Sequence, residues 1–180
     1  MSRPRLLGAI LAGGEARRFG SDKALAEIDG RAMIDHVAAC LRPQVDALAV
    51  VGRDHGGLLR IDDAPTPGLG PLGALLGALR YATAAGYDAV LSAPCDMPLL
   101  PHDLAARLDP APAYVAQHPV VGLWPVSTEP MLSTLLASGN HAVRAFADRC
   151  GARPVEIAGL INVNRTQDLE ALGPFGHRTR

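Results

Sequence analysis

The fold is decided by the stretch Leu6-Leu-Gly-Ala-Ile-Leu-Ala-Gly-Gly14, an apolar run that ends in a glycine pair. Continuous rather than alternating hydrophobicity predicts a strand covered on both faces, as in a mainly parallel sheet. The run is too short to cross a membrane, and charged residues return at Glu15. We therefore expect a buried first strand here and not a signal peptide.

Five further apolar runs alternate with segments of helical periodicity. We expect strands at Ala47–Val51, Ala89–Ala93, Ala113–Ala116, Val120–Trp124 and Val155–Ile157. The helical segments are Met33–Leu41, stopped by Pro43; Leu72–Leu79, opened by Pro71 and closed near Gly86; Val143–Cys150, capped by Gly151; and a last helix from Thr166 through Leu172. This order predicts an α/β fold, a three-layer, doubly wound and mainly parallel sheet in a single domain. The domain should span residues 1–173, with residues 174–180 as a frayed tail.

The composition limits the classes of function. The chain has 180 residues, of which 48% are hydrophobic, and 17 basic against 18 acidic residues give a net charge of −1. A nucleic-acid-binding protein would show a basic excess, so we expect no nucleic-acid partner. The three cysteines are odd in number and far apart, without a Cys-x-x-Cys pair for zinc or redox chemistry. They predict reduced thiols and a cytoplasmic protein without membrane attachment.

The first strand is followed by a loop suited to phosphate binding, Leu11-Ala-Gly-Gly-Glu-Ala-Arg-Arg-Phe-Gly-Ser-Asp-Lys23. Two glycines directly after a strand let backbone N–H groups point into a nest that accepts phosphate oxygens. Arg17 and Lys23 add positive charge to the same loop. The loop is not a Walker A motif, because no Gly-Lys-Ser/Thr follows the glycines. The alternative is a tight strand-to-helix turn with solvated charges.

A second glycine-rich stretch, Ile61-Asp-Asp-Ala-Pro-Thr-Pro-Gly-Leu-Gly-Pro-Leu-Gly73, opens the second helix. It contains Gly-x-Gly-x-x-Gly, yet a dinucleotide fingerprint should sit immediately after a strand, and residues 62–67 intervene. We favour glycines that let the backbone pass close to a flat ligand such as a base. Either Asp62 or Asp63 would then lie at the edge of the pocket.

A third motif, Ala93-Pro-Cys-Asp-Met-Pro98, follows a central strand. Asp96, held between two prolines, would be a rigid carboxylate at the ligand-binding edge of the sheet. Mg²⁺ needs only one or two carboxylates when substrate phosphates and waters complete its shell. The alternative is that Asp96 caps the next helix, although Asp103 is better placed to do so. With Arg17 and Lys23, Asp96 predicts a catalytic set for phosphoryl-type chemistry.

Taken together, these motifs resemble the molybdenum cofactor guanylyltransferases, from Leu11 to about Leu169. The resemblance rests on Leu11-Ala-Gly-Gly14 with Arg17, Gly20 and Asp22-Lys23, on Gly70-Pro-Leu-Gly-Ala-Leu75, on Cys95-Asp-Met-Pro98 and on Asn162-Val-Asn164. It implies a Rossmann-like fold of the nucleotide-diphospho-sugar-transferase type. It also implies transfer of GMP from GTP to the molybdopterin form of the molybdenum cofactor, with release of pyrophosphate.

The same resemblance implies the site residues and the partners. GTP would be bound by Leu11, Ala12, Gly13, Gly14, Lys23, Asp63 and Asp96. Asp96 would also hold the cofactor Mg²⁺, and Asn162 and Asn164 would lie on the acceptor side. Besides GTP and molybdopterin, the resemblance points to molybdoenzymes or other cofactor-biosynthesis proteins as partners.

Two departures from the family pattern bear on specificity. Members can carry an asparagine for the base just after the second strand, where this chain reads Val51-Gly52-Arg53, and the stretch from Leu108 to His118 is shorter than usual. We expect a purine preference that is less strict than in those relatives, and a trimmed acceptor cleft. Two alternatives stay open: a nucleotidyltransferase with another NTP or acceptor, such as a molybdenum cofactor cytidylyltransferase, and a non-catalytic nucleotide-binding homologue.

Overall fold

The computed structural model describes residues 3–13 and 23–163 of the chain, without the side chain of Lys23. Several sequence-based predictions therefore lie outside the described residues. They concern Gly14, Arg17, Asn164, the helix expected from Thr166 and the tail 174–180.

A seven-stranded sheet forms the centre of the described structure, in the order β5-β4-β1-β6-β8-β7-β9. The strands are β1 (Leu6–Leu11), β4 (Ala47–Val51), β5 (Leu59–Ile61), β6 (Ala89–Pro94), β7 (Ala113–Val115), β8 (His118–Pro125) and β9 (Arg153–Val155). Strands β5, β4, β1 and β6 pair in parallel with one another in that order, and β9 pairs in parallel with β7. The mainly parallel sheet is thus confirmed, with β8 as the antiparallel exception. A two-residue turn joins β7 to β8, and so short a connection can only reverse the chain.

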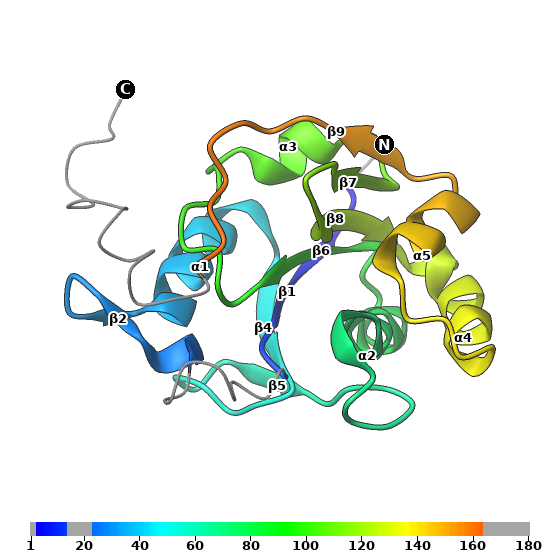
Figure 1. Ribbon diagram of the computed structural model, residues 1–180, viewed down its shortest axis with the longest axis horizontal. Coiled ribbons are helices and arrows are strands. Elements are labelled where there is room, and N and C mark those ends of the chain that lie inside the picture. The colour runs from blue at the N-terminus through cyan, green and yellow to red at the C-terminus, as the bar shows by residue number, and fades with distance from the viewer. Residues whose placement is uncertain (1–2, 14–22, 164–180) are drawn as a thin grey trace.

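Helices cover both faces of this sheet and complete the three expected layers (Figure 1). One face carries α1 (Met33–Leu41) and α3 (Leu104–Leu108), and the other carries α2 (Gly70–Ala85), α4 (Glu129–Ala137) and α5 (Val143–Arg149). The leucine stripe predicted for the second helix is buried throughout. Gly86, in the left-handed conformation at φ 73°, ends that helix as expected. Short 3₁₀ turns lie at Arg42–Gln44 (η2) and Val126–Thr128 (η3).

A small hairpin between β1 and α1 was not expected from the sequence. It pairs β2 (Glu27–Ile28) with β3 (Arg31–Ala32) and follows the 3₁₀ turn η1 (Lys23–Leu25). Asp29 and Gly30 connect its strands with φ values of 51° and 72°. Asp-Gly is the residue pair that such a turn favours, so the signal was present in the sequence.

Other differences from the expected elements concern the edges of the sheet. The last strand is Arg153–Val155 and not Val155–Ile157, because pairing with β7 sets Arg153 opposite Ala113. Strand β5 was missed because it is short and exposed, with Arg60 in the middle of its three residues. Helix α4 was not expected either, although Pro130 lies in its first turn and Leu132, Leu135 and Leu136 form its buried stripe.

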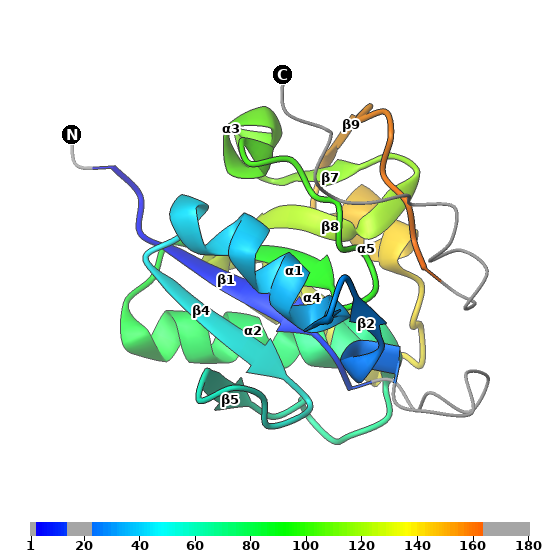
Figure 2. The same cartoon turned by 90° about the vertical axis from the view of Figure 1, so that its left-hand side faces the viewer.

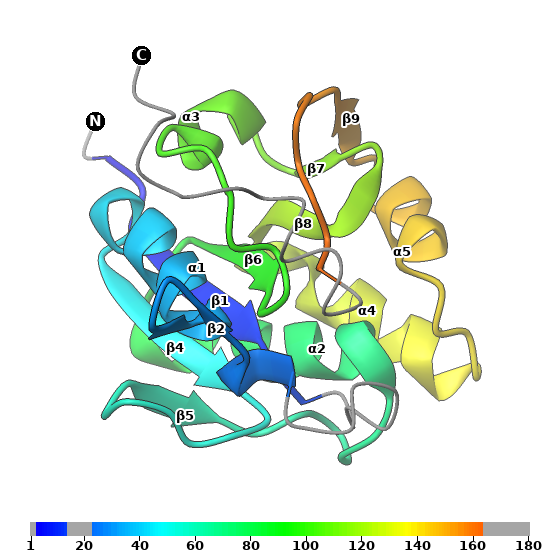
Figure 3. The same cartoon turned by 60° about the vertical axis from the view of Figure 1, so that its left-hand side comes forward.

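The parallel strands set up a single ligand-binding edge. Figure 2 shows β1 and β4 side by side with their arrowheads at the same end, and Figure 3 shows β6 pointing the same way. The amino-terminal end of β8 reaches this edge too, because β8 runs antiparallel to β6. Residues that follow β1, β4, β5 and β6 are therefore brought together, as in other open α/β sheets.

Candidate active site

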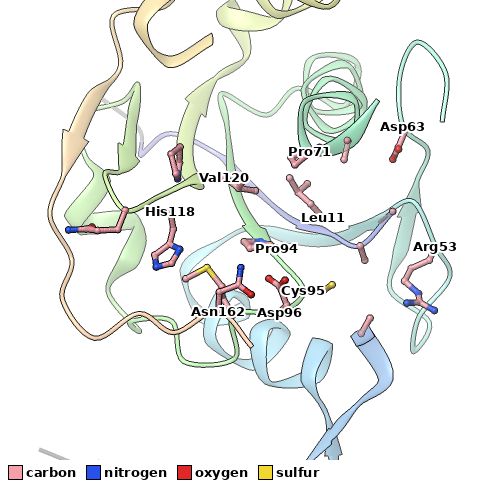
Figure 4. Close-up of a pocket in the computed structure, with 18 residues that line it drawn as sticks. Leu11, Arg53, Asp63, Pro71, Pro94, Cys95, Asp96, His118, Val120 and Asn162 are labelled. Carbon is pink, nitrogen blue, oxygen red and sulfur yellow. The ribbon is translucent and has the colours of Figure 1, made fainter. Parts of the chain in front are cut away.

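A cleft of about 470 Å³ opens along this edge of the sheet. Its walls come from the ends of four parallel strands, the start of α2, the turn between β7 and β8, and the segment after β9 (Figure 4). The residues used below are Leu11, Ala12, Gly13, Arg53, Asp63, Gly70, Pro71, Asp96, Gln117, His118 and Asn162. We call the part near Arg53 and Asp63 the nucleotide end, and the part near Asp96, His118 and Asn162 the acceptor end.

Close contact between backbones builds the nucleotide end. Ala12 N–H donates to the Val51 carbonyl at 3.0 Å, which brings the loop after β1 against the end of β4. Gly52 has a φ of +89°, and a Cβ there would lie 2.5 Å from the Gly13 Cα. A Cβ on Gly13 would in turn lie 3.2 Å from both carboxylate oxygens of Asp63. Glycine at both positions is what allows the backbone to approach this carboxylate.

Asp63 and not Asp62 faces the cleft. Asp62 is exposed and paired with Arg60 at 3.0 Å. Burial raises the pKa of Asp63 above its ordinary value, and the negative charge of Asp62 adds to the rise. A hydrogen bond from the Gly68 backbone lowers the pKa but does not cancel the effect of burial. The Oδ1 atom of Asp63 is buried and accepts no hydrogen bond from the residues that the structure describes.

The glycine-rich stretch before α2 supports a wall of the cleft. Gly70 and Pro71 line it. Along α2, Gly77 packs so tightly that an added Cβ would meet the Asp62 carbonyl oxygen. The Gly-x-Gly-x-x-Gly pattern does not directly follow a strand, because β5 ends at Ile61 and α2 begins at Gly70. This placement disfavours the dinucleotide interpretation.

Asp96 lies at the centre of the sheet's ligand-binding edge. Cys95 N–H donates to the Leu11 carbonyl at 3.2 Å, and Val163 N–H donates to the Asp96 carbonyl at 2.9 Å. The second contact brings Asn162 next to Asp96, as Figure 4 shows. Asp96 does not cap the next helix: the N-cap residue of α3 is Asp103, whose carboxylate pairs with Arg107 at 2.7 Å. The capping alternative for Asp96 is therefore wrong.

Most of the describable site residues predicted from the sequence meet at this cleft. Leu11, Ala12, Gly13, Asp63, Asp96 and Asn162 all line it. Lys23 begins η1, and its neighbour Ala24 lines the cleft, but the Lys23 side chain is outside the description. Gly14, Arg17 and Asn164 lie outside the described residues.

Three cleft residues were not predicted as site residues: Arg53, Gln117 and His118. Arg53 belongs to the stretch Val51-Gly52-Arg53 after the second strand of the parallel set, where members of the family can carry an asparagine, and the sequence alone predicts no role for its side chain. His118 and Gln117 reach the cleft only because β8 is antiparallel, which the apolar run Val120–Trp124 did not indicate. Among the described residues, no group of three or more His, Cys, Asp or Glu side chains could hold a metal by itself.

Comparison with known proteins agrees with this geometry. Residues 8–155 match the family model described as the MobA-like NTP transferase domain. The chain belongs to this family. A molybdenum cofactor guanylyltransferase from Cereibacter sphaeroides is 42% identical over 184 residues, with 92% of this chain and 94% of the relative covered. One from Acidiphilium cryptum is 39% identical over 186 residues, with 94% and 95% covered.

Solved structures of nucleotidyltransferases share the fold of this chain. The molybdopterin-guanine dinucleotide biosynthesis protein A from Archaeoglobus fulgidus superposes with a TM-score of 0.75 at 20% identity, covering 92% of this chain and 95% of that one. A 4-diphosphocytidyl-2C-methyl-D-erythritol synthase gives a TM-score of 0.69 at 16% identity, with 95% and 98% covered. At these identities the likeness concerns the fold, which is Rossmann-like as expected. Within the described part of this family member, no helix is long and apolar enough to cross a membrane.

Proposed function

We propose that the protein transfers GMP from GTP to the phosphate of the molybdopterin form of the molybdenum cofactor and releases pyrophosphate. The observation that carries the proposal is a cleft with a partly buried carboxylate, Asp63, at one end and a second carboxylate, Asp96, after a central strand, at the edge where such sheets bind ligands. We take the acceptor, the molybdenum cofactor, from the names of the relatives, which are molybdenum cofactor guanylyltransferases. Because the reaction consumes GTP, we place it in the cytoplasm.

The nucleotide end suits guanine. A carboxylate accepts hydrogen bonds from the N1–H and the N2 amino group of guanine, and adenine presents an acceptor at N1. The buried Oδ1 of Asp63 offers such an acceptor in a cleft that Gly13 and Gly70 also line. Arg53, at the same end, has the donors that suit the O6 and N7 acceptors of guanine. We therefore propose GTP as the preferred nucleotide, with Asp63 and Arg53 reading the base.

The acceptor end has oxygen ligands that fit Mg²⁺. The Asp96 carboxylate lines the cleft, and the buried Oδ1 of Asn162 accepts no hydrogen bond from the described residues. An octahedral Mg²⁺ takes one or two protein oxygens and completes its shell with waters and substrate phosphates, which matches this small donor set. When bound, the ion would neutralise charge on the α- and β-phosphates. We propose that Asp96 holds it, with Asn162 as the neighbouring oxygen.

The reaction needs no nucleophile from the protein. An oxygen of the acceptor phosphate forms the new bond to the α-phosphorus, the bond from that phosphorus to the bridging oxygen breaks, and pyrophosphate leaves with the electron pair. The protein orients the two phosphates and stabilises the developing charge. From the sequence we propose that Leu11 to Gly14 cradle the phosphates, that Lys23 and Arg17 draw charge off the leaving group, and that Asn164 lies on the acceptor side.

The first experiment measures pyrophosphate release with each NTP in turn, in the presence of Mg²⁺ and molybdopterin. We expect release with GTP, weaker release with ATP, and none without the acceptor. Equal turnover with CTP and GTP would contradict the base assignment and favour a cytidylyltransferase. GTP binding without release by any NTP would favour a non-catalytic homologue.

A matched pair of variants tests the base reader. Asp63→Asn replaces an acceptor oxygen by an amide that cannot accept from both donors of guanine, so GTP should bind on the order of tenfold or more weakly. Asp62→Asn is the control, because Asp62 is exposed and paired with Arg60. Calorimetric titration with GTP and ATP gives the measurement, and equal losses for both variants would contradict the role of Asp63.

A further inference from the structure

We propose that His118 binds the phosphate of the acceptor and sets it in line with the α-phosphate of the nucleotide. This inference deepens the proposed function and rests on it. The phosphate concerned is the terminal monoester of molybdopterin, whose oxygen forms the new bond. His118 would thus be a substrate-binding residue of the acceptor end, with a role separate from the recognition of the base.

The antiparallel pairing of β6 and β8 brings His118 to the same cleft as Asp96. Strand β6 pairs antiparallel with β8, with Ser92 opposite Gly122 and Leu91 opposite Leu123. Asp96 follows the end of β6 at Pro94, and His118 is the first residue of β8, so both lie at the same edge of the sheet. Both residues line the cleft, and Figure 4 shows the His118 ring on the acceptor side of Asp96 and Asn162. Asp63 and Arg53 lie at the opposite end in the same view.

The imidazole of His118 lacks the kind of hydrogen-bond partner that His36 and His55 have among the described residues. His36 contacts the Ile28 carbonyl at 2.9 Å, and His55 pairs with the Asp35 carboxylate at 2.7 Å. His118 forms no hydrogen bond to any residue that the structure describes, although it is only partly exposed and faces a cleft. The N–H donor and the nitrogen acceptor of this half-buried ring can therefore form hydrogen bonds with a ligand.

The turn that presents His118 is fixed from three directions. Ala116 N–H donates to the Val155 carbonyl at 3.0 Å, which ties the turn to β9. Arg144 of α5 donates from its guanidinium to the Ala116 carbonyl at 2.7 Å. The Gln117 amide donates to the Glu156 carboxylate. These contacts hold Ala116 and Gln117 in place. The side chain of the next residue, His118, lines the cleft. Such support is what a preorganised binding residue requires.

The chemistry of the site selects a phosphate as the ligand. An imidazole N–H donates to an anionic phosphate oxygen whether the ring is neutral or protonated, and a bond to a charged acceptor is stronger than one between neutral groups. The buried Oδ1 of Asn162 beside it repels an anion unless a cation or a donor intervenes, so it fits the metal side of the site. His118 is then a described donor at the acceptor end, where an incoming phosphate would face Asp96.

The test compares His118→Phe and His118→Gln with the unchanged protein. Phenylalanine keeps a ring of similar size but removes the hydrogen bond, and glutamine keeps an N–H donor in reach. We expect the KM for molybdopterin to rise about tenfold to a hundredfold in His118→Phe and by less in His118→Gln. The KM for GTP, and the Kd of GTP measured without acceptor, should stay within about twofold. His102→Phe is the matched control, because His102 is exposed on the loop before α3.

The possible outcomes are distinct. An unchanged acceptor KM in His118→Phe overturns the inference, and so does an equal rise in the KM values of acceptor and GTP, which would indicate general damage to the cleft. Circular dichroism and GTP affinity establish that each variant is folded. If the unchanged protein releases no pyrophosphate with any NTP, the proposed function itself fails, and that result is read before any variant is compared.

Discussion

The nucleotide end and the acceptor end of the cleft are built by different means. At the nucleotide end, backbones touch: Gly52 lies against Gly13, and Gly13 lies against the Asp63 carboxylate. Behind the acceptor end, a side chain bridges β6 and β8: Ser92 Oγ donates to the Val120 carbonyl at 2.6 Å and accepts from Trp124 Nε1 at 2.9 Å. An added Cβ at Gly52 or Gly13 would crowd the first half, whereas the second depends on hydrogen bonds between particular side chains.

This difference follows from strand direction. Strands β4, β1 and β6 are parallel and end together, so their loops crowd at one edge and only glycine fits where they meet. Strand β8 is antiparallel, so its first residue, His118, reaches the cleft. The turn before His118 is held by contacts with α5 and β9. We infer that substitutions at the nucleotide end damage the protein through steric overlap, and that substitutions at the acceptor end damage it through the loss of hydrogen bonds.

Asp96, at the acceptor end, is the proposed Mg²⁺ ligand, and its change should have the largest effect. Asp96→Asn keeps the size and removes the charge that a hard cation requires, so kcat/KM should fall on the order of 10²–10³-fold. Activity across a Mg²⁺ titration gives the measurement. Thermal unfolding should change little, because Asp103 and not Asp96 occupies the N-cap of α3. Normal turnover at limiting Mg²⁺ would shift the metal assignment to Asp63.

Gly52→Ala should be the most damaging change to the stability of the nucleotide end. Its φ of +89° is strained for any other residue, and the new Cβ would meet the Gly13 backbone. Left-handed strain and overpacking together predict a loss of about 2–5 kcal/mol of unfolding free energy, measured by urea denaturation. Gly57→Ala is the control. Gly57 also has a positive φ, +70°, but an added Cβ there would meet no described atom within 4 Å apart from its chain neighbours. Equal losses for the two variants would mean that close approach contributes nothing.

Ser92→Ala should be the corresponding change for the acceptor end. The substitution leaves the buried indole N–H of Trp124 and the Val120 carbonyl without this partner. An unsatisfied buried group predicts a loss of about 1–3 kcal/mol. Ser133→Ala removes an exposed hydroxyl that accepts from Arg80 at 3.2 Å and should stay within about 0.5 kcal/mol. The GTP Kd of Ser92→Ala should be unchanged, because Ser92 lies outside the nucleotide end.

Arg144→Ala should weaken the acceptor end without touching the nucleotide end. Loss of the 2.7 Å contact to the Ala116 carbonyl frees the turn that carries His118. One exposed hydrogen bond predicts a rise of about twofold to tenfold in the KM for the acceptor, with the GTP KM unchanged. Arg149→Ala, at the other end of α5, serves as the control. A rise in the GTP KM instead would argue that the two ends are coupled.

The sequence predicted the parallel half well and the antiparallel half poorly. Strands Leu6–Leu11 and Ala47–Val51 were predicted with their observed bounds, because buried parallel strands are continuous apolar runs. Gly13 and Asp96 were placed at the cleft by the same reasoning, since residues after parallel strands share an edge, whereas Asp63 was chosen over Asp62 only through the family resemblance. His118 did not follow, because its place depends on pairing with β6 and on a turn held by distant residues. Long-range register of that kind leaves no local pattern in the sequence.

The smallest effect should be on the stability of the nucleotide-free protein in Asp63→Asn. Burial raises the pKa of Asp63 in the folded state above its unfolded value, so the folded protein holds the proton more tightly. Stability is therefore lost as the pH rises through the folded pKa, where the buried carboxyl becomes charged. Asparagine avoids that charge and should raise Tm at neutral pH by about 1–3 °C, even though it weakens GTP binding.

The pH dependence makes this last prediction specific. Below the unfolded pKa the carboxyl is protonated in both states, so Asp63→Asn and the unchanged protein should unfold at the same temperature. The difference should open as the pH rises and stay constant once Asp63 is charged. Asp62→Asn should show no such gain, because the exposed Asp62 loses its pairing with Arg60. A gain in Tm that is independent of pH would show that the effect comes from packing and not from a carboxylate kept buried for the nucleotide.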